Sequence, residues 1–256
     1  MLDPVVLFFM AFGLEMTDNG LGGGYGTILS PLLIIFGYDP RVIVPAILLS
    51  EMVSGLFGGF WHVRYKNVNF KAVGATLLGS VLAMIAASFI VGLLVPSVYV
   101  KWYISGLAFF MGLLVVVKSY SYIKPRGPDG FSKSKCALLG AIIGFNKGST
   151  GGGYGPLSVS GYILLGLPAA VAIGTTTVAE GVACLIGVIT YTSTIGIILD
   201  VALPITIGAA LADPISAWIN NRLKEKVEPP FHGRLVGVAM SVLGLVTLLK
   251  LFGVLP

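Results

Sequence analysis

Charged residues are scarce in this 256-residue sequence, at only 11% of the chain. A soluble domain normally carries roughly 25% charged residues. Hydrophobic residues make up 56% of the chain, and a soluble fold of this size could not cover that much apolar surface. The scarcity of charge therefore excludes an ordinary soluble domain and indicates a membrane protein.

Residue types that bind metals or perform catalysis are also rare. The sequence has two cysteines and two histidines, and they form no cluster with metal-ligand or redox spacing. We interpret Cys136 and Cys184, which lie in apolar surroundings, as small buried hydrophobic residues. No nucleophile-and-base pair and no Walker-type phosphate loop occurs. We therefore expect no enzymatic activity, no metal and no cofactor.

Long apolar stretches, in contrast, fill the chain. They are residues 5–36, 42–61, 70–94, 98–117, 136–166, 168–191, 198–219 and 235–252. Most have the roughly 20 residues that a helix needs to span a bilayer. The first and the fifth are longer and contain glycine runs, which break helices. The pattern predicts an all-α integral membrane protein with two glycine-broken segments.

The two glycine runs also reveal an internal repeat. Residues 22–26 and 151–155 both read Gly-Gly-Gly-Tyr-Gly, and the same offset of 129 relates Glu51 to Glu180. It also relates Gly37 to Gly166, Gly58 to Gly187 and Gly79 to Gly208. Repeats of this length with one irregular loop per copy are typical of transporters. We predict a first repeat in residues 1–118, a linker in 119–135 and a second repeat in 136–256.

The distribution of lysine and arginine indicates how the broken segments lie. If each crosses the membrane once, basic residues divide almost evenly between the two sides, which violates the positive-inside rule. If each is a re-entrant hairpin, one side holds Arg64, Lys66, Lys71, Lys118, Lys124, Arg126, Lys133, Lys135, Arg222, Lys224, Lys226 and Arg234, and the other Arg41, Lys101 and Lys250. We therefore predict two inverted repeats, each a re-entrant hairpin plus three transmembrane helices. Both termini then lie outside and the linker lies in the cytoplasm, in a multi-pass protein of the cell membrane.

The glycine loops at membrane depth need protein or a polar cavity around them, because lipid offers no hydrogen bonds. We expect the two loops to meet at a shared central site. The arm after each loop, residues 27–36 or 156–165, then starts near the midplane, where free N–H groups and a positive helix end attract anions. Alternatively, the glycines only permit tight helix packing.

Ionisable residues within the apolar stretches are costly in lipid and functional by default. They are Glu15, Asp18, Glu51, Lys147, Glu180 and Asp213. Glu51 and Glu180 lie near the middle of their helices and suit either proton coupling or hydrogen bonding to a hairpin backbone. We interpret Asp213, late in its helix, as structural and close to the cytoplasmic interface.

Asp18 and Lys147 occupy equivalent places in the two broken segments. They either form a buried ion pair, which is the structurally safer interpretation, or Lys147 contacts an anionic substrate. Five acids against one lysine favour a cation or proton carrier, whereas the hairpin helix ends favour an anion.

The two loops resemble those of a known family, the TauE/SafE-type sulfite exporters and related anion permeases. Residues 17–26, Thr-Asp-Asn-Gly-Leu-Gly-Gly-Gly-Tyr-Gly, are similar to its Asp-containing, glycine-rich loop. Residues 151–156 are similar to its second loop, which often has Trp where Tyr154 stands. Ser50-Glu51 and Ala179-Glu180 are similar to a small-residue-plus-Glu element found in both halves. Members tend to carry Asp where this sequence has Lys147, which puts the substrate in doubt.

The resemblance implies a secondary transporter that moves sulfite, an organosulfonate or a similar sulfur-containing anion by alternating access between the hairpins. Candidate substrate-binding residues are Asn19, Gly22, Gly23, Gly24, Tyr25, Asn146, Lys147, Ser149, Thr150, Gly151, Gly152, Gly153 and Tyr154. Candidate coupling or gating residues are Asp18, Glu51 and Glu180.

A cation- or proton-linked carrier and a non-transporting membrane scaffold are the alternatives. The partners that we expect are the anion and the lipid bilayer, and the residues leave open a coupling proton or sodium ion and a homo-oligomer. Nucleic acid is not expected, since the basic residues lie in short loops between apolar stretches, where they set membrane orientation.

Overall fold

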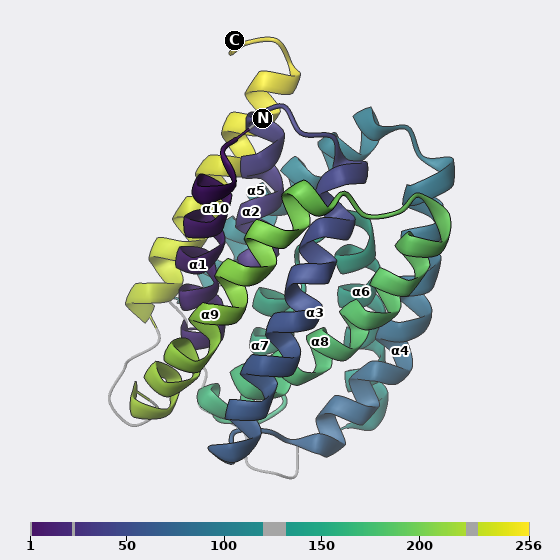
Figure 1. Ribbon diagram of the computed structural model, residues 1–256. Helices are drawn as coiled ribbons and strands as arrows, with labels where there is room; N and C mark the ends of the chain where they lie inside the picture. Colours follow the sequence, from purple (N-terminus) through teal and green to yellow (C-terminus); the bar gives the residue numbers. More distant parts are fainter. Residues whose placement is uncertain (1, 22–23, 120–131, 224–229, 256) are drawn as a thin grey trace.

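A computed structural model describes residues 2–21, 24–119, 132–223 and 230–255. The helices are α1 (Pro4–Leu21), α2 (Tyr25–Ile35), α3 (Pro40–Arg64), α4 (Phe70–Phe89), α5 (Ser97–Ser119), α6 (Lys133–Thr150), α7 (Gly155–Leu164), α8 (Ala169–Thr194), α9 (Leu199–Leu223) and α10 (Pro230–Leu251). A π-helical turn, Ile90–Leu94, continues α4. The described part of the chain contains no strand, so the prediction of an all-α protein is confirmed (Figure 1).

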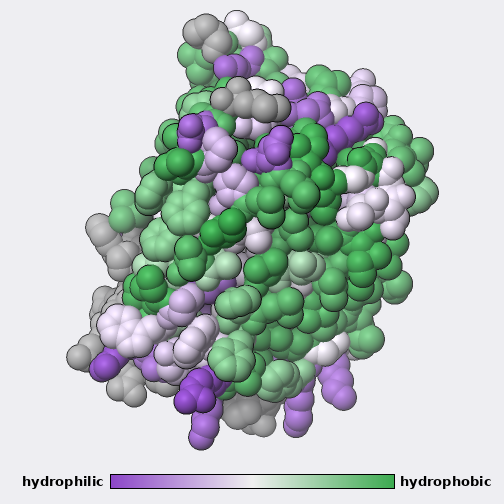
Figure 2. All heavy atoms as spheres, viewed as in Figure 1, coloured by the Kyte–Doolittle hydropathy of each residue, from purple (hydrophilic) through white to green (hydrophobic). Residues whose placement is uncertain are grey.

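Six helices in the described ranges are long and apolar enough to cross a bilayer: α3, α4 with its π-helical turn, α5, α8, α9 and α10. Large hydrophobic side chains stay exposed on them, and Leu78 and Leu82 of α4 are 71% and 72% exposed. Figure 2 shows an apolar surface over the middle of the bundle, with hydrophilic residues toward its two ends. Such a surface suits lipid rather than water. The chain is a multi-pass membrane protein.

The glycine runs interrupt the helices where the sequence predicts. Gly24, with φ 84°, lies before α2, and Gly151 and Gly153, with φ 71° and 78°, lie between α6 and α7. Residues with a side chain rarely adopt this left-handed conformation, so glycine suits these turns. Gly22 and Gly23 lie outside the described residues. The arms α2 and α7 begin at Tyr25 and Gly155, slightly earlier than predicted.

The two halves of the chain pack against each other through contacts that repeat at the offset of 129. Gly79 of α4 lies against the backbone of Ala137 in α6, and Gly208 of α9 lies against the backbone of Phe8 in α1. Residues 79 and 208, like residues 8 and 137, are related by that offset. At both places a methyl group would collide with backbone atoms of the other helix. These glycines therefore permit the α4–α6 and α1–α9 packing.

The connections between the helices lie at two opposite ends of the bundle. Figure 1 shows both chain ends at the end where α3 starts, whereas α3 finishes and α4 starts at the opposite end. Cys136 and Cys184 are buried, as predicted. The inverted relation of the halves and the side of the membrane that each end faces stay predictions.

Candidate functional site

The centre of the molecule is the place where α3 and α8 cross. Gly55 of α3 and Gly181 of α8 bring the two backbones so close that a side chain at either would collide with the other helix. Glu51 lies one helical turn before Gly55, and Glu180 directly precedes Gly181. The close crossing therefore brings the two repeat-related glutamates into one buried region.

The two broken hairpins meet beside this crossing. The Gly153 N–H donates to Thr27 Oγ1 at 2.7 Å, and the Ser30 hydroxyl donates to the Thr150 carbonyl oxygen at 2.7 Å. A methyl group at Gly152 would lie 2.7 Å from Thr27 Cα. The predicted meeting of the two loops is confirmed, and the packing role of glycine holds at Gly152.

Several backbone N–H groups in the described part of the two loops already have partners within the protein. The Asp18 carboxylate accepts hydrogen bonds from the Gly24 N–H at 2.8 Å and the Tyr25 N–H at 2.9 Å. In the second loop, the Gly152 N–H donates to Thr150 Oγ1 at 3.0 Å. The N–H groups of Gly24 and Tyr25 at the start of α2 are therefore not free, contrary to the expectation for this helix end. Asp18 supplies the negative charge at this helix end that we expected from a ligand.

Lys147 lies at the centre of a buried ion triad. Its ammonium pairs with the Glu51 carboxylate and with Glu180 Oε1, the latter at 2.8 Å. The side chain of Lys147 is only 1% exposed. The predicted pair with Asp18 is wrong, because Asp18 caps the start of α2 while the helix crossing places both glutamates beside the lysine. With two carboxylates and one ammonium, the triad carries one excess negative charge when all three groups are ionised.

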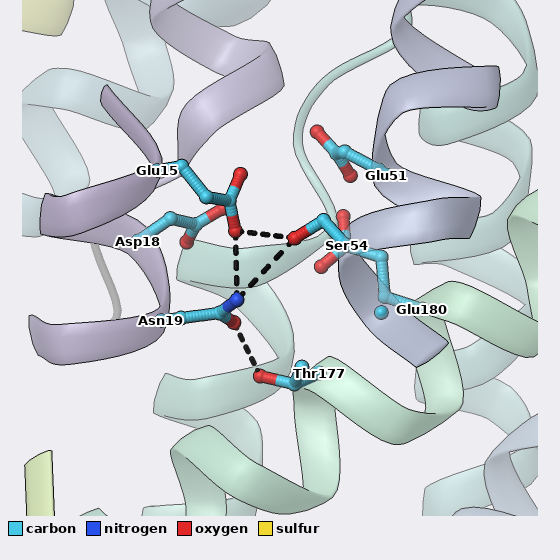
Figure 3. Close-up of a pocket in the computed structure, with 8 residues that line it drawn as sticks. Glu15, Asp18, Asn19, Glu51, Ser54, Thr177 and Glu180 are labelled. Atoms are coloured by element: carbon cyan, nitrogen blue, oxygen red, sulfur yellow. Dashed lines mark hydrogen bonds between the residues drawn. The ribbon is translucent and has the colours of Figure 1, made fainter. Parts of the chain in front are cut away.

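A small polar pocket lies next to the triad (Figure 3). It is lined by Glu15, Asp18, Asn19, Glu51, Ser54, Gly55, Thr177 and Glu180. These residues come from α1, α3 and α8. The lining contains all three candidate coupling residues, but of the candidate substrate-binding residues that the structure describes it contains only Asn19. The structure thus brings together the coupling set more closely than the substrate-binding set.

Several other candidate binding residues among those that the structure describes do not line the pocket. The Tyr25 hydroxyl lies 2.9 Å from Ser50 Oγ, and Asn146 Oδ1 accepts a hydrogen bond from the Tyr103 hydroxyl. The Ser149 hydroxyl is buried without a hydrogen-bond partner. Tyr154 is also buried completely. None of these side chains lines the pocket.

Two acids contribute to this region in a way that the sequence reasoning missed. Asp213 is 0% exposed, and its Oδ1 accepts hydrogen bonds from the Asn19 amide and the Ser54 hydroxyl. It is buried because α9 packs against both α1 and α3, and its position relative to the cytoplasmic interface stays a prediction. Glu15, one helical turn before Asn19, bonds to the same two side chains. That one-turn spacing of Glu15 and Asn19 was the available sequence signal.

The sequence of the chain is similar to a family of known proteins. The family model described as "Sulfite exporter TauE/SafE" matches residues 7–247. The chain is 28% identical over 249 residues to the probable membrane transporter protein YtnM of Bacillus subtilis (strain 168), covering 91% of this chain and 78% of the relative. It is 27% identical over 175 residues to the probable membrane transporter protein YjnA of the same organism, covering 63% of this chain and 67% of the relative. No solved structure matches the chain significantly.

Proposed function

The chain belongs to the sulfite exporter TauE/SafE family, and from that premise we propose that it carries a small sulfur-containing anion across the cell membrane. Sulfite and organosulfonates are the substrates proposed. The family match over residues 7–247 supports a transporter, as do two relatives named as probable membrane transporters. The anion itself is inferred from the chemistry of the buried site.

Lys147 is the observation that carries the choice of an anion. It is the only lysine or arginine that is buried in the described part of the chain. A sulfite or sulfonate group presents oxygen atoms to an ammonium much as a carboxylate does, through charge-assisted hydrogen bonds. We propose that the anion takes the place of one glutamate beside Lys147. Glu51 and Glu180 hold the ammonium in position when no anion is bound.

Protonation of the triad fits this exchange. With Glu51 and Glu180 both ionised, an incoming anion meets an excess of negative charge. A proton on either glutamate removes that excess and leaves the Lys147 ammonium free to attract the anion. The proposed transport is therefore linked to proton uptake near the site.

We further propose that access alternates between the two sides of an inverted repeat. The reciprocal contacts of Gly79 with Ala137 and of Gly208 with Phe8 support two halves related by a two-fold exchange. The exposed or partly exposed basic residues at the end where α3 finishes and α4 starts support a cytoplasmic location for that end. In the described ranges they are Arg64, Lys66, Lys71, Lys133, Lys135, Arg222 and Arg234.

A second candidate function, a cation- or proton-linked carrier without an anion, is favoured by the acidic lining of the pocket. Four of its eight lining residues are carboxylates. A cation would bind to these oxygen atoms directly, whereas an anion needs Lys147. The two candidates therefore predict different ligands for the purified protein.

Ligand-dependent stabilisation separates the candidates, because a ligand that binds only the folded state raises the unfolding temperature. We expect sulfite to raise the unfolding temperature of the purified protein in detergent, and equal concentrations of chloride to have no such effect. Lys147→Met should lose the stabilisation by sulfite. Its matched control is Lys101→Met, which removes a lysine near the start of α5, outside the site, and should keep it. Stabilisation by sodium ions and not by sulfite or a sulfonate would favour the cation carrier instead.

A further inference from the structure

A second pair of acids lies beside the ion triad, on either side of one serine. Ser54 Oγ is 2.7 Å from Glu15 Oε1 and 2.8 Å from Asp213 Oδ1. The Asn19 amide nitrogen is hydrogen-bonded to the same two oxygen atoms, at 2.7 Å in the case of Glu15. Glu15 and Asp213 come from α1 and α9, and they are 2% and 0% exposed. Figure 3 shows the Glu15, Ser54 and Asn19 part of this arrangement.

The number of protons in this arrangement points to a protonated acid. A serine hydroxyl has one proton and can donate it to only one acceptor, while an amide nitrogen has two. Asn19 can therefore satisfy both carboxyl groups, but Ser54 can donate to only one of them. The other contact of Ser54 needs a donor on the carboxyl group itself. One proton on Glu15 or Asp213 completes the set of hydrogen bonds.

The second oxygen atom of each acid indicates independently that one of the two acids is protonated. Glu15 Oε2 and Asp213 Oδ2 are buried and have no hydrogen-bond partner. The ammonium of Lys147 pairs with the other two glutamates. Two ionised carboxylates with unsatisfied oxygen atoms would be costly at this depth. When two like-charged acids share a site, one of them keeps its proton.

The same geometry disfavours a metal cation between the two acids. Glu15 Oε1 and Asp213 Oδ1 face the amide hydrogens of Asn19, and a cation is repelled by such donors. The amide is held in this orientation because its oxygen accepts a hydrogen bond from Thr177 Oγ1 at 2.7 Å. A proton fits between the acids without displacing the amide.

We propose that Glu15 and Asp213 share one proton and form a proton-binding site of the carrier, distinct from the Lys147 triad. Other ionisable groups face this pair from the helices packed against it. They are Asp18 on α1, Tyr25 on α2, Glu51 on α3 and Glu180 on α8. Loss of the shared proton adds a negative charge beside the triad and disfavours an anion at Lys147.

His62 extends this arrangement toward the end of the bundle where α3 finishes. Gly58 lies against the Asn19 amide and Asp213 Oδ1, and His62 follows it by one helical turn. The imidazole is 0% exposed, and neither ring nitrogen has a hydrogen-bond partner. His62 is thus a buried imidazole one helical turn beyond the glycine that contacts the pair.

Infrared spectroscopy of the purified protein tests the shared proton without any substrate. We expect a carbonyl stretching band of a protonated carboxylic acid at neutral pH. This band should be lost in Glu15→Gln and equally in Asp213→Asn, because the acid that remains can ionise once its neighbour is neutral. The matched control is Asp18→Asn, in the same pocket, which should keep the band because two backbone N–H groups already stabilise the Asp18 carboxylate.

Ser54→Ala keeps both acids and removes the bridging hydroxyl, so it should shift the band without abolishing it. This variant preserves the test if the other variants fail to fold. Absence of the band in the wild-type protein, or its loss in only one of the two acid variants, would overturn the shared proton.

That the shared proton is coupled to transport rests on the proposed function. The existence of the shared proton does not. The pH dependence of sulfite uptake by Glu15→Gln should be weaker than that of wild-type uptake, with the part due to the triad remaining. An unchanged pH dependence would overturn the coupling role alone. A wild-type protein that shows the infrared band but transports no sulfite would instead contradict the proposed anion.

Discussion

Replacement of Lys147 by methionine tests both the structural and the functional role of the ion triad. The substitution removes the buried ammonium and leaves Glu51 and Glu180 without the partner that they share. Removal of one partner from a buried ion pair costs about 3–5 kcal/mol, because the remaining charge is left unpaired. For a chain of this size, such a loss lowers the unfolding temperature by roughly 6–20 °C.

A triple variant, Lys147→Met with Glu51→Gln and Glu180→Gln, separates the two roles. It removes every charge of the triad, and with it the cost of leaving a buried charge without its partner. We therefore expect the triple variant to regain the stability of the wild-type protein. It should not regain stabilisation by sulfite, because the ammonium is still absent.

The assay is the unfolding temperature in detergent at one fixed heating rate, measured with and without sulfite, because membrane proteins commonly unfold irreversibly. If the Lys147→Met variant is as stable as the wild type, the buried triad is refuted. A triple variant that sulfite stabilises as strongly as the wild type would refute the role of Lys147 in anion binding.

Gly152→Ala should destabilise the protein by about 1–3 kcal/mol through overpacking, whereas Gly106→Ala, which faces open space, should not; equal unfolding temperatures would contradict the packing of the hairpins. Cysteines placed at Lys66 and Val254 should react with impermeant reagents from opposite sides, the former from the cytoplasm, and labelling of both from one side would exclude the proposed topology. Glu180→Gln should change the pH dependence of transport, and normal transport with an unchanged pH dependence would leave this glutamate a structural role only.

The sequence predicted the six spanning helices and the two breaks because a bilayer restricts the backbone severely. A run of apolar residues without hydrogen-bond partners must be helical, and glycine must stand where the helix is interrupted. The repeat was visible because residues 22–26 and 151–155 are identical. The meeting of the two loops followed from the need of irregular backbone for polar or protein surroundings.

The partners of individual side chains could not be predicted in the same way. The offset relates Asp18 to Lys147, but ion pairing depends on which helices cross. Lys147 pairs with glutamates of α3 and α8 because Gly55 and Gly181 let those helices approach closely. The hydrogen bonds of Asp213 with Asn19 and Ser54 likewise depend on how α9 packs against α1 and α3. These relations are properties of the tertiary packing and leave no periodic pattern in the chain.

Uptake of radiolabelled sulfite by proteoliposomes that contain the purified protein tests the central claim most directly. We predict uptake that saturates with sulfite concentration, is accelerated when the pH is lower on the side of the labelled sulfite, and is inhibited by an excess of unlabelled sulfonate. The triple variant without charges at Lys147, Glu51 and Glu180 should insert equally well and show no uptake above that of empty liposomes. Sulfite uptake by that variant at the wild-type rate, or none by the wild-type protein while sodium ions are transported, would contradict an anion carrier built around Lys147.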